Sequence, residues 1–184
     1  MGRISPITIF SPIPRWWSWW LTFTWPLARG NPLITRPLEK LGFINFAHWS
    51  IFGRVPKGGR RRDARRLPQP YILFQSNFNG PADLYIDAFS LVVPFRLCLL
   101  WGAAYGYPGA RPMQRFRDYI NCHALPAAGY HYWAAYPDAS SRMVVSALAL
   151  RKAVDRFSED AAELPPDEFA SAYTRFLGEV QSHL

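Results

Sequence analysis

Cysteine is scarce in this chain, and the aromatic run near its N-terminus is too short to cross a membrane. The chain holds two cysteines, Cys98 and Cys122, and thiols in a protein without a signal peptide are typical of a reducing compartment. The uncharged run Trp16–Ala28 contains Pro26 and falls short of the ~20 residues that a transmembrane helix needs. We therefore expect a cytoplasmic protein with reduced thiols and no membrane span in this region.

The chain also lacks the short motifs that identify common enzyme classes. It contains no G-x-S-x-G elbow, no Walker loop, no dinucleotide fingerprint and no H-E-x-x-H pair. His123 follows Cys122, but no second pair of ligands completes a zinc site. The sequence therefore predicts no metal site and does not identify a reaction.

Acidic residues are nearly absent from the first third of the chain, which is strongly basic. The first 66 residues carry a formal charge of +10 and the remainder −2. This charge predicts anionic lipid or an acidic protein partner as the ligand, with a solvated loop as the alternative. Nucleic acid is disfavoured because no recognition module accompanies the charge. The candidate anion-binding residues are Arg54, Lys57, Arg60, Arg61, Arg62, Arg65 and Arg66, with Arg111 beside the helix-opening Pro112.

Aromatic residues are abundant, and the segment PRWWSWWLTFTWPL (14–27) holds five of the eight tryptophans. A helix would place Trp16, Trp19, Trp20, Phe23 and Leu27 on one face, and indole rings favour the headgroup zone of a membrane. The alternative is an arm that packs on the sheet and closes the core. An arm that buries one side and shows the other to lipid satisfies both interpretations. The candidate membrane-interface residues are Trp16, Trp17, Trp19, Trp20, Phe23 and Trp25.

The rest of the chain alternates between strand and helix patterns. The runs FINFAHWSIF (43–52) and YILFQSNF (71–78) predict an antiparallel pair of strands joined by a basic polar loop, 53–70. Prolines 6, 12 and 14 predict turns before the tryptophan-rich run. Further strands are expected at 97–105 and 130–136, and helices at 81–93, 112–122, from 138 onward, and at 166–182.

This order of elements predicts an α+β fold, with helices on one face of a largely antiparallel sheet. We expect residues 1–42 to form a Trp/Pro-rich arm that meets a membrane or packs on the core. Residues 43–184 are expected to form one domain that ends in a pair of helices.

Parts of the sequence resemble two groups of known proteins. SNFNGPADLYIDAF (76–89), WGAAYGYPGARPMQRFRDYI (101–120) and YHYWAAYPDAS (130–140) resemble a family of small actinobacterial proteins without an assigned reaction, over roughly residues 1–150. That family supplies no catalytic residues to carry over. More remotely, the element order is similar to ferredoxin-like dimeric α+β barrels, which include haem peroxidases and small monooxygenases. This second resemblance implies a ferredoxin-like core and a homodimer through the sheet.

Three hypotheses for function follow. The first is a peripheral protein at the inner face of the membrane, bound to anionic lipid or to an acidic partner. The second is an oxidative enzyme, haem-dependent or cofactor-free, in which His48 or His131 lies near the haem or an aromatic substrate; haem enters only with this hypothesis. The third is an accessory subunit of a larger complex.

Overall fold

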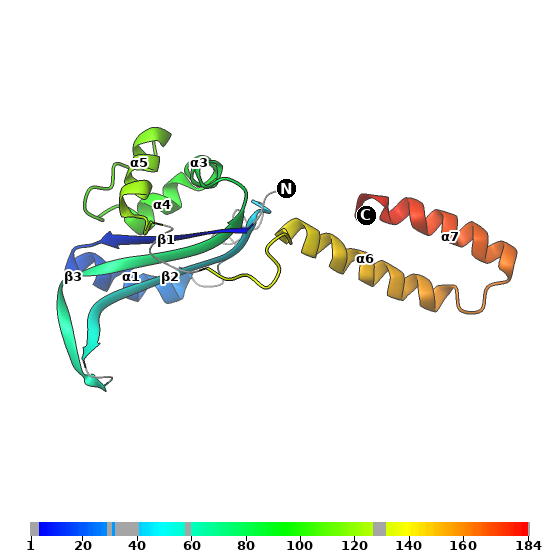
Figure 1. Cartoon of the computed structure of the whole chain (residues 1–184), viewed down its shortest axis with the longest axis horizontal. Coiled ribbons are helices and arrows are strands. Elements are labelled where there is room, and N and C mark those ends of the chain that lie inside the picture. The colour runs from blue at the N-terminus through cyan, green and yellow to red at the C-terminus, as the bar shows by residue number, and fades with distance from the viewer. Residues whose placement is uncertain (1–3, 29–30, 32–40, 58–59, 127–131, 184) are drawn as a thin grey trace. The chain divides into compact units, whose positions relative to one another are not determined.

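The computed structural model describes residues 4–28, 31, 41–57, 60–126 and 132–183; for residues 27, 28, 56, 57 and 60–63 it describes only the backbone. The chain divides into two compact units, Met1–Asp138 and Ala139–Leu184 (Figure 1). The first unit holds a three-stranded antiparallel sheet with helices, and the second holds two helices. The predicted α+β class is confirmed.

The sheet has the order β1-β3-β2, with β3 in the centre. Its strands are β1 (Ile4–Pro12), β2 (Ile44–Lys57) and β3 (Arg60–Asn79), and both predicted strands and their antiparallel pairing are confirmed. The predicted loop 53–70 is wrong. The β2–β3 ladder continues past Gly53, with Arg54 opposite Arg66 and Lys57 opposite Arg60. Once residues 44–52 and 71–78 fix the register, the flanking backbone groups satisfy each other by extending the hairpin.

Strand β1 is absent from the sequence-based prediction because its prolines indicate turns. Pro6 and Pro12 lie within β1, which is an edge strand of the sheet, where the missing N–H groups are tolerated. The outer edge of β1 is partly covered, because Leu125 N donates to Thr8 O and Ile4 N donates to Pro137 O, both at 2.9 Å or less. The segment expected to be an arm that meets a membrane or packs on the core therefore contributes a strand to the sheet.

One face of the sheet is buried under the helices. Inward side chains alternate along β1 and β3 at Ile7, Ile9, Ile72, Phe74 and Phe78, as the period of a strand requires. The covering helices are α1 (Arg15–Ala28), α3 (Ala82–Val92), α4 (Pro94–Trp101) and α5 (Met113–His123).

Ring contacts show that α3 and α4 meet the same face of the sheet. Phe78 stacks on Tyr85 of α3 with centroids 3.9 Å apart, and Phe74 lies edge-on to Trp101 of α4 at 5.6 Å. Burial in this layer raises the pKa of the Tyr85 hydroxyl. The helices expected at 81–93 and 112–122 correspond to α3 and α5 and are confirmed.

Two predicted strands are wrong. Residues 97–101 belong to α4, which begins at Pro94, and turns follow it. A short apolar run has no decisive period, and proline favours the first position of a helix. Residues 132–136 form no strand, and residues 130 and 131 lie outside the described part of the chain. The ferredoxin-like arrangement is consequently not confirmed. That fold has two βαβ units and four strands, whereas the described residues contain three strands and no strand follows α3 to complete a second unit.

The second unit consists of α6 (Ser141–Asp160) and α7 (Pro166–Val180), followed by the short 3₁₀ turn η2 (Gln181–His183). Ser140 caps α6, because its hydroxyl accepts a hydrogen bond from Met143 N at 3.1 Å. The predicted pair of C-terminal helices is confirmed, but it forms a unit of its own rather than part of a single domain 43–184.

Candidate membrane and anion interface

The inward side of α1 packs on the sheet and on α4. Trp17 Nε1 donates to a backbone carbonyl of α4 at 3.1 Å, and the ring stacks on Trp20 with centroids 4.6 Å apart. Leu21 is 2% exposed, and Trp25 lies edge-on to Trp49 of β2. Three of the predicted interface residues, Trp17, Trp20 and Trp25, therefore lie on the packed side of the helix.

The outward side of α1 carries three large aromatic rings. Trp16, Trp19 and Phe23 are 63%, 67% and 70% exposed, and their spacing places them along one stripe of the helix. Rings of this size next to one another on a surface mark an interaction site more often than isolated apolar residues do. The helix thus buries one aromatic side and presents another.

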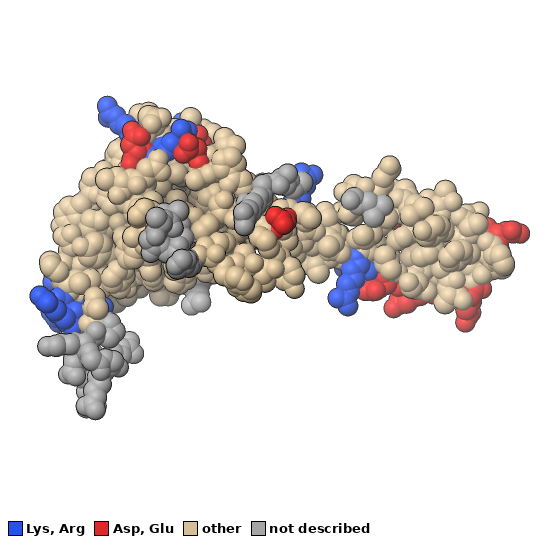
Figure 2. Space-filling model, viewed as in Figure 1, with Lys and Arg blue, Asp and Glu red and all other residues tan. Residues whose placement is uncertain are grey.

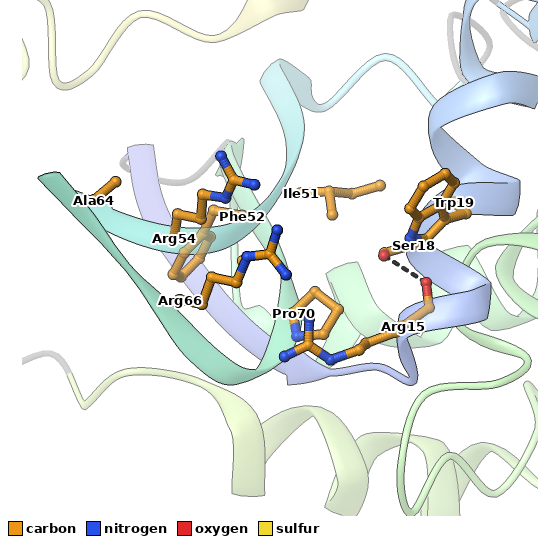
Figure 3. Close-up of a pocket in the computed structure, with 10 residues that line it drawn as sticks. Arg15, Ser18, Trp19, Ile51, Phe52, Arg54, Ala64, Arg66 and Pro70 are labelled. Atoms are coloured by element: carbon orange, nitrogen blue, oxygen red, sulfur yellow. Dashed lines mark hydrogen bonds between the residues drawn. The ribbon is translucent and has the colours of Figure 1, made fainter. Parts of the chain in front are cut away.

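A cationic cleft, lined by Arg15, Arg54 and Arg66, lies beside this stripe (Figure 3). Arg15 comes from the first turn of α1, whereas Arg54 and Arg66 come from the extended part of the β2–β3 hairpin. The cleft has a volume of about 510 Å³, and Trp19 forms part of its wall. The aromatic stripe and the cleft therefore share the side chain of Trp19.

The charges of the cleft are not neutralised by the described part of the protein. Arg54 and Arg66 are direct cross-strand partners, and like charges in that position repel. The Arg15 guanidinium donates to Leu67 O at 3.2 Å and to Pro68 O at 3.3 Å, which holds the charge at the cleft wall. No described carboxylate lies within ion-pair distance of these three arginines.

Two other candidate anion-binding residues, Arg65 and Arg111, do not line the cleft. Arg65 is adjacent to Arg66 but, by the alternation of the strand, points to the opposite face. Figure 2 shows basic side chains, with no acidic ones beside them on that view, where the described part of the hairpin leaves the body of the unit. Arg111 is exposed and precedes α5. The structure describes the backbone but not the side chains of Lys57, Arg60, Arg61 and Arg62.

The two candidate histidines are not brought together by the described residues. His48 lies on the uncovered face of β2, where its exposed ring stacks on Phe46 at 6.2 Å. His131 lies outside the described residues. An exposed histidine on an open sheet face does not provide the enclosed apolar pocket that suits a haem ligand, so this geometry gives the oxidative-enzyme hypothesis no support.

Two carboxylates of α3 share a basic partner that the sequence did not indicate. Asp87 forms an ion pair with Arg117 of α5, and Asp83 lies 3.9 Å from the same guanidinium. These carboxylates tie α3 to α5. The sequence also did not indicate that Arg15 lines the cleft with Arg54 and Arg66, because that position depends on the packing of α1 and on the register of the hairpin.

The described residues offer neither a metal site nor a single helix that could span a membrane. In the described part of the chain, no group of three or more His, Cys, Asp or Glu is placed to hold a metal ion. No single described helix has the length and apolar character of a membrane span, although α3 and α4 pass that test together as a pair bent by 97°. Neither protein families, curated proteins nor solved structures compared with this chain contain a match.

Proposed function

We propose that this protein is a peripheral membrane protein that binds anionic lipid surfaces through α1 and the adjacent cationic cleft. The observation that carries the proposal is the outward stripe of Trp16, Trp19 and Phe23 beside three arginines without carboxylate partners among the described residues. Tryptophan rings suit the headgroup zone, where both an apolar ring and a polar N–H are accommodated.

The aromatic stripe and the arginines of the cleft contribute different amounts to the free energy of membrane binding. Full burial of a large apolar side chain contributes about 1.5–3 kcal/mol, and a basic residue near an anionic surface contributes about 1 kcal/mol. The aromatic stripe therefore supplies most of the affinity, while the arginines supply the preference for anionic lipid. The helix lies in the interface without crossing the bilayer, and the inner face of the cytoplasmic membrane is the proposed location.

The test is sedimentation of the full chain with vesicles. We expect binding to vesicles of phosphatidylcholine mixed with phosphatidylserine, and much weaker binding to phosphatidylcholine alone. Salt at about 1 M should weaken the binding without abolishing it, since the Debye length falls to about 3 Å while the apolar contacts remain. Tryptophan emission should shift to the blue on binding.

The same sedimentation experiment can refute the proposal. A protein that stays in the supernatant with both kinds of vesicle at low salt would refute the membrane proposal. Capture of an acidic protein by the same surface, in the absence of lipid, would favour the accessory-subunit hypothesis instead.

A further inference from the structure

We propose that the cleft lined by Arg15, Arg54 and Arg66 binds a phosphate monoester, which at a membrane is the headgroup of phosphatidic acid; the membrane setting rests on the function proposed above. Three guanidinium groups gather there without a described carboxylate. Guanidinium forks match the oxygens of phosphate and form charge-assisted hydrogen bonds with them. A monoester carries up to two negative charges, which suits this surplus better than a singly charged diester.

The pairing of Arg54 with Arg66 is the feature that points to a ligand. These two side chains are direct partners in the ladder, an arrangement that costs stability in the free protein. An anion between them converts the repulsion into two attractions. The third cation, Arg15, is held at the wall by its two carbonyl contacts, so it is already oriented for a ligand.

The position of the cleft suits a lipid headgroup. Trp19 lines the cleft and belongs to the outward aromatic stripe. If the stripe lies at the headgroup level, the cleft lies at that level too. The volume of about 510 Å³ is ample for a phosphate and its nearest substituents.

The experiment compares Arg66→Gln with Arg65→Gln, which remove the same charge from adjacent positions on opposite faces of β3. Binding is measured with vesicles containing phosphatidic acid and with phosphatidylserine vesicles of matched surface charge. We expect the wild type to prefer phosphatidic acid. Arg66→Gln should reduce that preference about tenfold, whereas Arg65→Gln should lower both affinities by one common factor and leave the preference unchanged.

A second arm separates lipid from free phosphate. Glycerol 1-phosphate is titrated into the wild type and both variants, and the arginine Nε–H signals are followed by NMR. Saturable, Arg66-dependent binding without vesicle binding would support the cleft and refute the membrane function. Equal losses in the two variants would overturn the cleft while leaving a diffuse membrane interaction in place. The melting temperature of Arg66→Gln should be unchanged or higher, because the repulsion with Arg54 is removed.

The unit Ala139–Leu184 consists of the helix pair α6 and α7 with the short turn η2. We infer that α6 and α7 associate with the same helices of a second copy, as an antiparallel four-helix bundle. Phe157 contacts the rings of Phe169, Tyr173 and Phe176 across the pair. A unit this short rarely has a sufficient core of its own, since single cores below about 70–80 residues supply little stability.

One side of the helix pair forms a groove in which the charged residues Arg156, Asp160, Arg175 and Glu179 lie among apolar ones. By helical spacing, the opposite side carries apolar residues from both helices that remain 40–53% exposed; they are Met143, Val154, Tyr173 and Leu177. Val145 and Leu148 are also exposed, but they lie on other sides of α6 and have no counterpart on α7. A side to which both helices contribute apolar residues is the pattern of a helix pair in a larger bundle.

Charge identifies a second copy as the occupant. Residues 141–152 contain three bases and no acid, whereas residues 153–168 contain six acids and one base. In an antiparallel, two-fold symmetric pair, the basic end of each copy lies beside the acidic end of the other. The contact is thus self-complementary, and it differs from the dimer through the sheet that the sequence predicts.

Val154→Glu and Val145→Glu provide a matched test. Val154 lies on the apolar side, whereas Val145, 67% exposed, lies on the opposite side of α6. Sedimentation equilibrium of the full chain should give a dimer for the wild type and for Val145→Glu. Val154→Glu should raise the dissociation constant at least tenfold. A monomeric wild type at about 100 μM, or equal effects of the two variants, would overturn the inference.

Discussion

Replacing Trp16, Trp19 and Phe23 together with serine is expected to release the protein from anionic vesicles while leaving its melting temperature nearly unchanged. These rings are 63–70% exposed, so they contribute little to the core. At about 1.5–3 kcal/mol for each inserted ring, their loss should lower the partition coefficient at least a thousandfold. Vesicle sedimentation and circular dichroism melting measure the two effects.

The matched control for this variant is Trp17→Ser on the inward side of the same helix. Trp17 stacks on Trp20 and donates a hydrogen bond to α4, so its loss should lower the melting temperature. At temperatures where Trp17→Ser remains folded, vesicle binding should persist. If the outward triple variant unfolds while the wild type shows no vesicle binding, the tryptophan-rich segment serves only the core.

The sequence does not decide that the tryptophan-rich segment is a helix, and helical spacing assigns its faces imperfectly. Trp20 was expected beside Trp16 and Trp19, and the structure places it on the packed flank instead. A helix composed of aromatic residues nearly all round has no polar side to mark its exposed face. The sheet and α4 decide which rings are covered, and that information is not local.

Other differences also arise from tertiary context. The sequence does not predict β1, because Pro6 and Pro12 indicate turns, although an edge strand tolerates prolines. The basic segment 53–70 has the composition of a loop, yet its backbone continues a ladder whose register is set farther along the chain. The same register brings Arg54 opposite Arg66, so the sequence identifies these cations but not their arrangement.

The α3 and α5 helices were predictable because their signals are local and agree with one another. Each follows a proline, and each has apolar residues at helical spacing that are buried in the structure. The only signal in the run 97–101 is its apolar character, which is common to buried strands and buried helices. Pro94, which directly follows the helix expected at 81–93, is the first residue of α4.

Trp101→Ala is expected to destabilise the first unit by about 3–5 kcal/mol, the usual cost of truncating a large buried aromatic residue. Trp101 is 2% exposed, its ring packs edge-on against Phe74, and its Nε1 donates to Ser11 Oγ at 3.0 Å. The substitution leaves a cavity between α4 and the sheet and removes the donor that satisfies a fully buried hydroxyl.

The comparison for Trp101→Ala is Trp133→Ala, the same change at a side chain that is 83% exposed. The second variant should stay within about 0.5 kcal/mol of the wild type. Urea unfolding followed by circular dichroism measures both. Similar losses in the two variants, or a loss below about 1 kcal/mol for Trp101→Ala, would contradict a core centred on the contact of α4 with β1 and β3. A loss confined to Trp101→Ala would show that the buried ring between α4 and the sheet, and not tryptophan content as such, stabilises the first unit.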